Sequence, residues 1–453
     1  MSRLEIVLSW DGSSVAGGLA EDSLRVTLTD RRGNPRFGLH QFLETVLRTG
    51  RQPSVQAFEL ALVALGVWLA DTRLSRQQHS EDNWTRNIHL LVPVRNVARW
   101  QSCARLICRL LGTLSGDIWS ISFYAASPEM GVYAERLALE DSLDAAAPPV
   151  ALFSGGLDSF AGAIDAYGRE PHAPVFVSQV DGGNSQTVES LTELLTTRTG
   201  RPVEIVKWAV SSRAADFGPG FSGQGELTMR ARSFLFFAAS AVVASAWKSA
   251  RVLVPENGFI SLNVPLDPWR LGALTTRTTH PFVIARFNDL LDELGLPARL
   301  ENPFQGKTKG EMLAQCEDRS LLWDGLDLTV SCSKPKFVRR YRAEFGTSHC
   351  GTCWPCLIRR AAIKHAYPTR SDPTKYVTEG LDYLDTEPGA KGHVIRSIQY
   401  GLNILRLPDD QLRWALATVA PLTDVEGHTQ ELLRCVRSGL LEVADIAGLE
   451  APQ

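Results

Sequence analysis

The pattern of apolar and polar positions changes along the chain, and residues 1–145 form the first stretch. Alternation of apolar and polar positions, which is typical of strands, occurs at residues 4–9, 24–29, 89–94 and 118–124. Residues 54–72 and 100–111 have apolar positions at helical spacing. This mixture predicts an N-terminal α+β accessory domain. We expect it to dock a partner or to mediate dimerisation, because no catalytic set of residues occurs in it.

From residue 150 onward, short apolar runs alternate with helical segments. The runs that indicate buried strands are 150–153, 174–180, 203–210 and 251–255, and the helices between them are 158–167, 186–197 and 232–249. This alternation predicts an α/β fold, a Rossmann-like doubly wound parallel sheet, over residues 146–367. Ligands of such sheets bind beyond the carboxyl ends of the strands, so residues 154–159, 179–183 and 256–258 are expected around one crevice. Helical spacing in residues 368–453 predicts a helical C-terminal extension.

Length and charge narrow the class of protein. A chain of 453 residues is long enough for two or three domains. Its net charge of −3 provides no global basic field, so direct nucleic-acid binding is not expected, although a local basic patch is compatible with it. The apolar stretches are too short or too interrupted to span a bilayer, and no signal segment opens the chain. We therefore expect a cytoplasmic protein with no membrane partner.

A glycine-rich segment follows the first strand of the predicted parallel sheet. Residues 150–159 are Val-Ala-Leu-Phe-Ser-Gly-Gly-Leu-Asp-Ser. Two glycines let the main chain approach an anion, two serines can donate hydrogen bonds, and the helix N-terminus adds partial positive charge. Asp158 would repel a bound phosphate unless a divalent cation lay between them, so we interpret it as a Mg²⁺ contact. An ordinary tight turn is the alternative, because short glycine motifs are common.

A cysteine cluster is the second distinctive motif. Cys350, Cys353 and Cys356 recur at every third position, and Cys332 lies upstream as a candidate fourth ligand. Four thiolates at ~2.3 Å form a closed tetrahedral shell around Zn²⁺, which predicts a structural zinc knuckle at residues 332–356. The alternatives are His349 as the fourth ligand, a redox-active cysteine pair, and chance spacing.

These two motifs together carry a family resemblance. Residues 154–159 resemble the Ser-Gly-Gly-X-Asp-Ser signature of the PP-loop ATP pyrophosphatases, and the knuckle of the form Cys-X17-Cys-X2-Cys-X2-Cys resembles that of the 7-cyano-7-deazaguanine synthase family. The resemblance covers residues 150–363 and implies a parallel sheet of the adenine nucleotide alpha-hydrolase type. The chain departs from the family where Ser233 replaces an asparagine and where the gap between Cys332 and Cys350 is longer than usual.

The resemblance also implies roles for individual residues. Arg232 and Lys309 stand at the family's arginine and lysine positions, and with Asp158 they form the implied catalytic set. The implied nucleotide-binding residues are Phe153, Ser154, Gly155, Gly156, Leu157, Asp158, Ser159 and Val177. The implied cofactors are ATP, Mg²⁺ and Zn²⁺. Without the resemblance, Arg232 would be interpreted as a helix-start arginine and Lys309 as a solvated surface lysine.

The family's chemistry indicates a reaction. Its members use ATP to adenylate the carboxylate of 7-carboxy-7-deazaguanine, release pyrophosphate, form an amide with ammonia, and dehydrate the amide to a nitrile. The resemblance therefore implies an ATP-dependent C–N ligase acting on a 7-deazaguanine-type small molecule. The added N-terminal and C-terminal regions resemble those of divergent relatives encoded in Qat-type anti-phage defence operons. A defence-operon partner protein is accordingly expected, and its amine is a candidate acceptor in place of ammonia.

Two other functions are compatible with the sequence. One is a nucleotide-binding scaffold subunit with reduced catalysis, and the other is a PP-loop enzyme that modifies tRNA or a nucleobase. The second would need a sulfur-handling cysteine near the adenylate and a basic RNA surface, and the acidic balance of the chain disfavours it. The presence of Asp158 and Lys309 favours chemistry over a scaffold.

Overall fold

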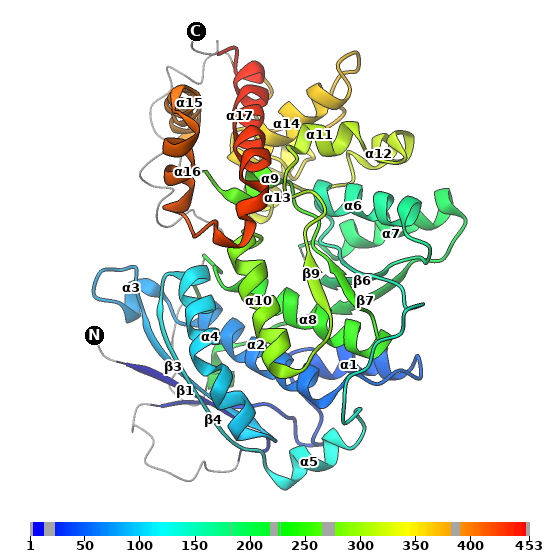
Figure 1. The fold of residues 1–453 in the computed structure, drawn as a ribbon, viewed down its shortest axis with the longest axis vertical. Coiled ribbons are helices and arrows are strands. Elements are labelled where there is room, and N and C mark those ends of the chain that lie inside the picture. The colour runs from blue at the N-terminus through cyan, green and yellow to red at the C-terminus, as the bar shows by residue number, and fades with distance from the viewer. Residues whose placement is uncertain are drawn as a thin grey trace.

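A computed structural model of the chain describes residues 3–12, 23–181, 183–217, 225–226, 228–264, 277–381 and 390–449. Residue 182, one of the predicted strand-end positions, lies outside the described residues. Within them the chain forms two sheets, both made of parallel strands, and a group of helices that follows them in sequence (Figure 1). The α/β class and the parallel strands predicted for the central region are thereby confirmed.

The N-terminal sheet has the strand order β2-β1-β3-β4, and every neighbouring pair is parallel. Its strands are β1 (Leu4–Ser9), β2 (Leu24–Thr27), β3 (Asn87–Val94) and β4 (Ile118–Ala125). Its helices are α1 (Leu39–Leu47), α2 (Val55–Arg73), α3 (Arg76–His79), α4 (Val97–Ser115) and α5 (Pro128–Ala134). The prediction of an α+β arrangement is therefore wrong for this region, which is α/β. Alternation along a strand shows which residues are buried but not the direction of its neighbour.

The central sheet has the strand order β7-β6-β5-β8-β9. Its strands are β5 (Val150–Leu152), β6 (Val175–Gln179), β7 (Glu204–Trp208), β8 (Arg251–Leu253) and β9 (Arg299–Glu301), and all pairs are parallel. The first strand of this sheet lies in the middle, so the chain reverses its direction of winding between β5 and β8. A crevice forms outside the carboxyl ends of the strands at such a switch point.

Alternate residues of the central strands face two separate cores. Val150 and Val252 pack with α8 on one face, whereas Ala151 and Leu253 pack with α6 on the other. Burial on both faces is what parallel sheets require, and it explains why their strands are continuous apolar runs. The helices and 3-10 turn of this region up to β9 are α6 (Leu157–Arg169), α7 (Ser185–Thr199), η1 (Ala214–Phe217), α8 (Arg232–Trp247), α9 (Gly258–Leu262) and α10 (Pro281–Leu294).

The two sheets share one hydrophobic core. Helix α2 of the N-terminal region packs against α8 of the central region, and buried residues of both belong to one continuous cluster. Among the described residues, α2 is also the one helix long and apolar enough to cross a membrane, and 89% of its most apolar window is buried inside the protein. Its apolar surface is therefore covered by protein, as in a core helix.

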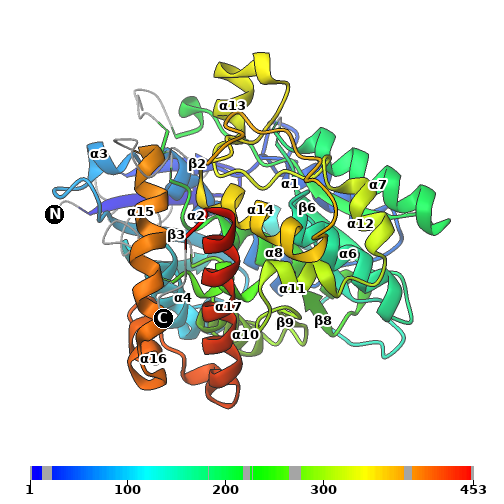
Figure 2. The same ribbon diagram turned by 90° about the horizontal axis from the view of Figure 1, so that it is seen from above.

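The remaining helices follow β9 in sequence. They are α11 (Lys309–Ala314), α12 (Arg319–Gly325), α13 (Pro335–Tyr341), η3 (Ala343–Phe345), α14 (Trp354–Ala366), α15 (Ala390–Leu402), η4 (Asn403–Arg406), α16 (Asp409–Ala417), η5 (Thr423–His428) and α17 (Thr429–Ile446). The helical spacing predicted for the C-terminal extension is confirmed over its described part. Helix α17 packs against α14 and α9, so the end of the chain lies beside the central region (Figures 1 and 2).

Candidate functional site

The predicted phosphate loop joins β5 to α6 at the switch point of the central sheet. Gly155 has φ +81°, and a Cβ at this position would lie 2.8 Å from Thr187 Cγ2, so only glycine fits. Gly156 is the N-cap of α6 and supplies no side chain to cap it. The amides of the first turn of α6 therefore keep the partial positive charge that attracts an anion.

The loop serines are bonded to one another. Ser154 Oγ donates to Ser159 Oγ at 3.2 Å, and Ser159 Oγ also lies 2.9 Å from the Gly156 carbonyl oxygen. The Gly156 amide donates to Ser154 Oγ at 3.3 Å. These bonds hold both hydroxyls on the loop, at the position where the sequence predicted phosphate donors.

Three of the predicted nucleotide-binding side chains are core residues. Phe153 and Leu157 are each 1% exposed and Val177 is 2% exposed. The Phe153 amide donates to the Val177 carbonyl at 2.9 Å, which is part of the pairing between β5 and β6. These residues could contact a ligand through the main chain only, whereas their side chains hold the loop on the sheet.

The structure brings two of the predicted catalytic residues together. Asp158, in the first turn of α6, lies with Oδ1 3.2 Å from Nζ of Lys309, the first residue of α11. Lys309 is 4% exposed and Asp158 is 7% exposed, so the interpretation of Lys309 as a solvated surface residue is wrong. Oδ1 accepts no hydrogen bond of good geometry from the described residues, although it forms this ion pair. A buried, under-bonded carboxylate oxygen is an available ligand for a cation or a proton.

Two further polar residues complete this cluster. Asn257, which is fully buried, donates from Nδ2 to Asp158 Oδ2 at 2.9 Å and lies 3.3 Å from Glu256 Oε1. Its own Oδ1 accepts from the amide of Ile260 and so caps α9. The sequence placed residues 256–258 near the crevice but did not include Glu256 or Asn257 among the predicted site residues. Their position directly after a buried strand was the signal that could have identified them.

The two carboxylates of this cluster have opposite pKa shifts. Burial raises the pKa of Glu256 well above its ordinary value, and the nearby negative charge of Asp158 raises it further. Burial acts in the same direction on Asp158, but the Lys309 ammonium and hydrogen bonds from Glu256 and Asn257 outweigh it, so its pKa is lowered. Of the two carboxyl groups, Glu256 therefore binds a proton more readily than Asp158.

The C-terminal helix supports the element that carries Lys309. Thr308 and Glu311 form a capping box at the start of α11, in which the Glu311 amide donates to Thr308 Oγ1 at 3.0 Å. Arg434 of α17 donates to Glu311 Oε2 at 3.2 Å, and the Thr308 hydroxyl donates to Glu442 Oε1 of the same helix. Helix α17 thus fixes the position of Lys309 relative to Asp158.

Arg232 lies apart from this cluster. Its Nε donates to Gln179 Oε1 at 3.1 Å, at the carboxyl end of β6, and its guanidinium lies 4.9 Å from the centre of the Phe236 ring. Burial lowers the pKa of Arg232, and the carboxylate of Asp181 only partly offsets this. Arg232 is therefore on the same edge of the sheet as Asp158 but has no contact with Asp158 or Lys309 among the described residues.

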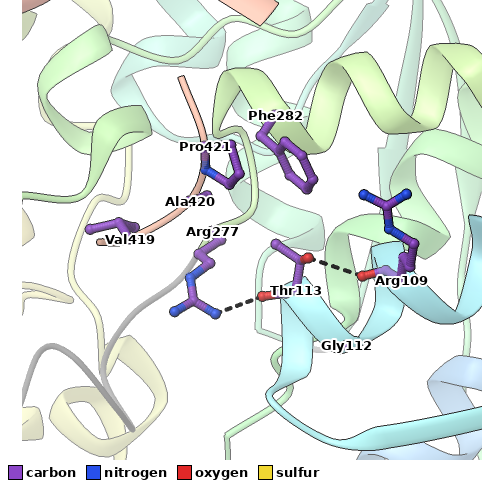
Figure 3. Close-up of a pocket in the computed structure, with 8 residues that line it drawn as sticks. All are labelled: Arg109, Gly112, Thr113, Arg277, Phe282, Val419, Ala420 and Pro421. Atoms are coloured by element: carbon purple, nitrogen blue, oxygen red, sulfur yellow. Dashed lines mark hydrogen bonds between the residues drawn. The ribbon is translucent and has the colours of Figure 1, made fainter. Parts of the chain in front are cut away.

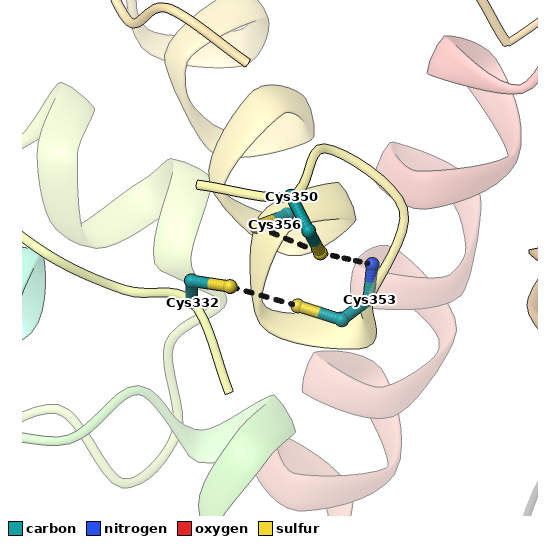
Figure 4. Close-up of side chains that lie close together, drawn as sticks. All are labelled: Cys332, Cys350, Cys353 and Cys356. Carbon is teal, nitrogen blue, oxygen red and sulfur yellow. Dashed lines mark hydrogen bonds between the residues drawn. The ribbon is translucent and has the colours of Figure 1, made fainter. Parts of the chain in front are cut away.

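The four predicted zinc ligands converge on one point (Figure 4). Cys332 Sγ lies 3.9 Å from Cys353 Sγ, Cys350 Sγ lies 4.0 Å from Cys356 Sγ, and all four sulfurs lie within 4.8 Å of one another. Sulfurs at ~2.3 Å from one tetrahedral ion are separated by about 3.8 Å, so this cluster is compatible with zinc. His349 is not the fourth ligand, because its Nε2 accepts from the amide of Ser331 at 3.2 Å.

The cysteine cluster is connected to the phosphate loop by the main chain. The Val330 amide, two residues before Cys332, donates to the carbonyl of Gly155 at 3.0 Å. Arg359 on α14, which is fully buried, donates to Thr329 Oγ1 at 2.7 Å and so holds the same segment from the other side. A metal that fixes Cys332 therefore also restrains the loop that carries Gly155.

A separate cavity of about 410 Å³ lies between the N-terminal and C-terminal parts of the chain (Figure 3). It is lined by Arg109, Gly112, Thr113, Arg277, Phe282, Val419, Ala420 and Pro421. Arg277 donates from Nη1 to the Thr113 carbonyl at 2.8 Å. None of the predicted site residues lines this cavity.

The sequence was compared with models of protein families and with curated proteins. No model of a known protein family matches the sequence, and no curated protein matches it at the required significance. The candidate site therefore rests on the geometry of Asp158, Glu256, Asn257 and Lys309 and on the cysteine cluster.

Proposed function

We propose that this protein adenylates the carboxylate of a 7-deazaguanine-type base with ATP, releases pyrophosphate, and transfers the activated carbon to an amine. The observation that carries the proposal is the buried ion pair between Asp158 and Lys309 beside the uncapped N-terminus of α6. Its position at the switch point of a parallel sheet is where such sheets bind nucleotides. The resemblance of residues 154–159 to the PP-loop signature suggests which nucleotide chemistry to test.

The reaction has two balanced steps. An oxygen of the substrate carboxylate attacks the α-phosphorus of ATP, an acyl–oxygen–phosphorus bond forms, and the bond to pyrophosphate breaks. The amine nitrogen then attacks the acyl carbon, AMP leaves with the electron pair of the broken carbon–oxygen bond, and the nitrogen loses a proton. Adenylation is needed because a free carboxylate has no adequate leaving group.

Different residues of the site would bind the phosphates, offset their charge and hold a divalent cation. The first-turn amides of α6 and the loop hydroxyls would bind the departing pyrophosphate, and Lys309 would offset negative charge that develops on the phosphates. Asp158 and Glu256 fit a divalent cation, because two carboxylates share the site with a single ammonium. Bound Mg²⁺ would supply charge stabilisation to the phosphates. Any proton on Glu256 would leave when a cation binds, because the cation favours the charged carboxylate.

A direct assay tests the proposal. The purified chain is incubated with Mg-ATP and 7-carboxy-7-deazaguanine, and pyrophosphate and AMP are measured. We expect release that requires the carboxylate substrate and that is lost in Lys309→Gln. The matched control is Lys307→Gln, a nearby lysine that lies outside the cluster and should retain release. Release independent of the carboxylate, or none at all, would leave a nucleotide-binding scaffold as the better account.

The acceptor amine requires its own experiment. We propose a defence-operon partner protein as acceptor, with ammonia as the simpler alternative. Intact-mass spectrometry of a partner co-expressed with the wild-type chain or with Lys309→Gln would show a mass gain in the first sample only. An unchanged partner mass in both samples, together with ammonia-dependent AMP release, would assign ammonia as the acceptor.

We further propose that the cysteine cluster holds zinc in a structural role. Four thiolates close the coordination shell and leave no position for substrate. Metal analysis should give one zinc per chain, and Cys356→Ser should lose it, whereas Cys316→Ser, a buried cysteine outside the cluster, should keep it. A full zinc content in Cys356→Ser would contradict this assignment.

A further inference from the structure

The segment between Cys332 and Cys350 contains a basic and aromatic surface that the proposed reaction does not use. We define the basic-aromatic arm as residues 334–345, which comprise α13 and η3. Its basic residues are Lys334, Lys336, Arg339, Arg340 and Arg342, and its aromatic residues are Phe337, Tyr341 and Phe345. Glu344 is its single acidic residue, so the arm has a net charge of +4 in a chain whose net charge is −3.

The aromatic side chains of the arm are exposed. Phe337 is 52% exposed, Tyr341 is 58% exposed and Phe345 is 42% exposed. The arm is anchored instead by Val338, which is 1% exposed and packs with the cysteine cluster. Figure 2 shows α13 projecting from the edge of the molecule. Core packing therefore does not account for the three aromatic rings.

The rings and the basic groups are arranged side by side. The ring centres of Phe337 and Tyr341, four residues apart on one helix, are separated by 4.9 Å. The guanidinium of Arg340 lies 5.3 Å from the centre of the Tyr341 ring. Lys334, Arg339 and Arg340 make no ion pair with any acidic side chain in the described part of the chain. The arm thus offers unpaired cations next to accessible aromatic faces.

The arm also lies at the rim of the crevice. Lys336 Nζ is 2.8 Å from Asp181 Oδ2, just beyond the carboxyl end of β6, where Gln179 receives the hydrogen bond from Arg232. This ion pair is solvent-exposed, since the Lys336 side chain is 66% exposed, so it adds little to stability and leaves the lysine free to bind elsewhere. A polymer bound to the arm would pass close to the candidate active site.

We propose that the basic-aromatic arm is a docking surface for single-stranded nucleic acid, with phosphates on Lys334, Arg339 and Arg340 and bases stacked on Phe337 and Tyr341. Unpaired cations beside exposed rings are the combination that binds single strands without sequence preference. Arginine and aromatic residues are also enriched at protein interfaces, so an acidic protein partner is the alternative that competition with polyglutamate tests. The seven residues of α13 are also too few for the continuous apolar face of a membrane-surface helix.

The test measures binding of the full chain, without ATP, to a fluorescent 20-nucleotide single strand of DNA or RNA by anisotropy at several KCl concentrations. Three phosphate contacts predict that the logarithm of the association constant falls with the logarithm of salt at a slope of about −2. Arg339→Glu with Arg340→Glu should weaken binding at least about tenfold and flatten this slope. The control, Arg31→Glu with Arg32→Glu, reverses two exposed arginines of the N-terminal region, outside the arm, and should change neither.

A second pair of variants separates nucleic acid from an acidic polypeptide. Phe337→Ala with Tyr341→Ala should weaken binding about tenfold and leave the salt slope unchanged, because stacking carries no counterion release. Circular dichroism and zinc content establish that each variant is folded, and Arg339→Gln with Arg340→Gln replaces the charge reversal if that variant is not. Wild-type affinity in the arginine variants would overturn the proposal. Competition by polyglutamate as strong as by unlabelled single strand would also overturn it.

This proposal does not depend on the proposed adenylation. Binding is measured without ATP, so a chain that binds single strands but releases no pyrophosphate supports nucleic-acid docking and contradicts the proposed adenylation. A chain that releases pyrophosphate but does not bind single strands supports adenylation and contradicts docking. The net charge of the whole chain disfavoured nucleic-acid binding, whereas the arm concentrates positive charge on one exposed helix.

Discussion

Two buried clusters of charged side chains, one in each sheet region, differ in how completely their atoms are bonded. In the N-terminal region Arg76 and Arg86 face Asp71 and Asp117, and all four side chains are 4% exposed or less. Each carboxylate oxygen there accepts a hydrogen bond: Arg86 binds both carboxylates, Arg76 binds Asp117, and the amide of Ala231 binds Asp71 Oδ2 at 2.8 Å. A third buried arginine, Arg230, lies beside these four side chains and donates to the Ser115 carbonyl at 3.1 Å.

The cluster at the crevice uses the same kinds of group but is incomplete. Lys309 faces Asp158 and Glu256, so one cation meets two carboxyl groups, and Asp158 Oδ1 has no well-formed hydrogen bond from the described residues. A protein keeps a buried charge under-bonded only where another group completes it, because an unsatisfied charge is costly. The two clusters therefore differ in their carboxylates: both oxygens of Asp71 and Asp117 are bonded, whereas Asp158 keeps one oxygen available to another ligand.

The largest expected effect is in the N-terminal cluster of Arg76, Arg86, Asp71 and Asp117, which we call the closed cluster because each of its carboxylate oxygens is bonded. Asp117→Ala removes the carboxylate that binds both arginines and leaves their charges buried, so it should lower the free energy of unfolding by about 3–5 kcal/mol. Urea unfolding followed by circular dichroism measures this. The control is Asp324→Ala, which removes an exposed ion pair with Arg198 and should cost about 0–1 kcal/mol. Equal losses in the two variants would mean that the closed cluster is not structural.

The cluster of Asp158, Glu256 and Lys309, which we call the open cluster, should respond in its activity as well as in its stability. Asp158→Asn keeps the shape of the side chain but removes its charge, so pyrophosphate release per folded protein should fall about 10²–10³-fold, as for the loss of one group that stabilises a transition state. The free energy of unfolding should also fall, because Lys309 is then a buried charge without its ion pair. A variant that is unstable but retains full specific activity would make Asp158 a structural residue.

The pH dependence of stability provides a smaller and more specific test. The pKa of Glu256 is raised above its ordinary value of 4.5, so the folded chain binds its proton more tightly than the unfolded chain. Its contribution to stability is complete below pH 4.5 and is lost as pH rises through the raised pKa, by up to about 1.4 kcal/mol per pH unit. The lowered pKa of Asp158 acts below its ordinary value of 3.8, outside this window.

Glu256→Gln measures this contribution. Urea unfolding of the wild type and the variant is compared at a series of pH values above 4.5, and the stability difference should shift in favour of the variant as pH rises, because glutamine cannot ionise. Glu189→Gln is the control: hydrogen bonds from Ser185 and Lys207 lower the pKa of Glu189 below its ordinary value of 4.5, so its difference above pH 4.5 should be flat. A stability difference for Glu256→Gln that does not change with pH would contradict the raised pKa of Glu256.

The smallest effect is expected at Arg232. Because it contacts Gln179 and Phe236 and not the Asp158 cluster, Arg232→Gln should reduce pyrophosphate release less than about tenfold, or about 1.4 kcal/mol. Lys309→Gln, measured in parallel, should have the much larger effect. A loss in Arg232→Gln as large as in Lys309→Gln would return Arg232 to the catalytic group that the resemblance implies.

The fold was predictable where its signal was local. Continuous apolar runs identified β5, β6, β7 and β8, and the spacing of apolar residues identified α8 to within two residues of its end. The edge strand β9 and helix α10 were not predicted, and β9 has a single apolar residue between Arg299 and Glu301, so it forms no apolar run. The N-terminal sheet was assigned to the wrong class because strand direction depends on pairing partners that are distant in sequence.

The cysteine cluster could be predicted from the sequence, whereas the cluster of Asp158, Glu256 and Lys309 could not. Three of the four cysteines lie within seven residues, so their convergence follows from a short turn, and the sequence identified all four. Asp158, Glu256 and Lys309 come from three separate elements, and only packing of α6, β8 and α11 around one switch point brings them into contact. Tertiary structure therefore decided which of the predicted residues share a site, because electrostatic coupling and burial depend on distance in space.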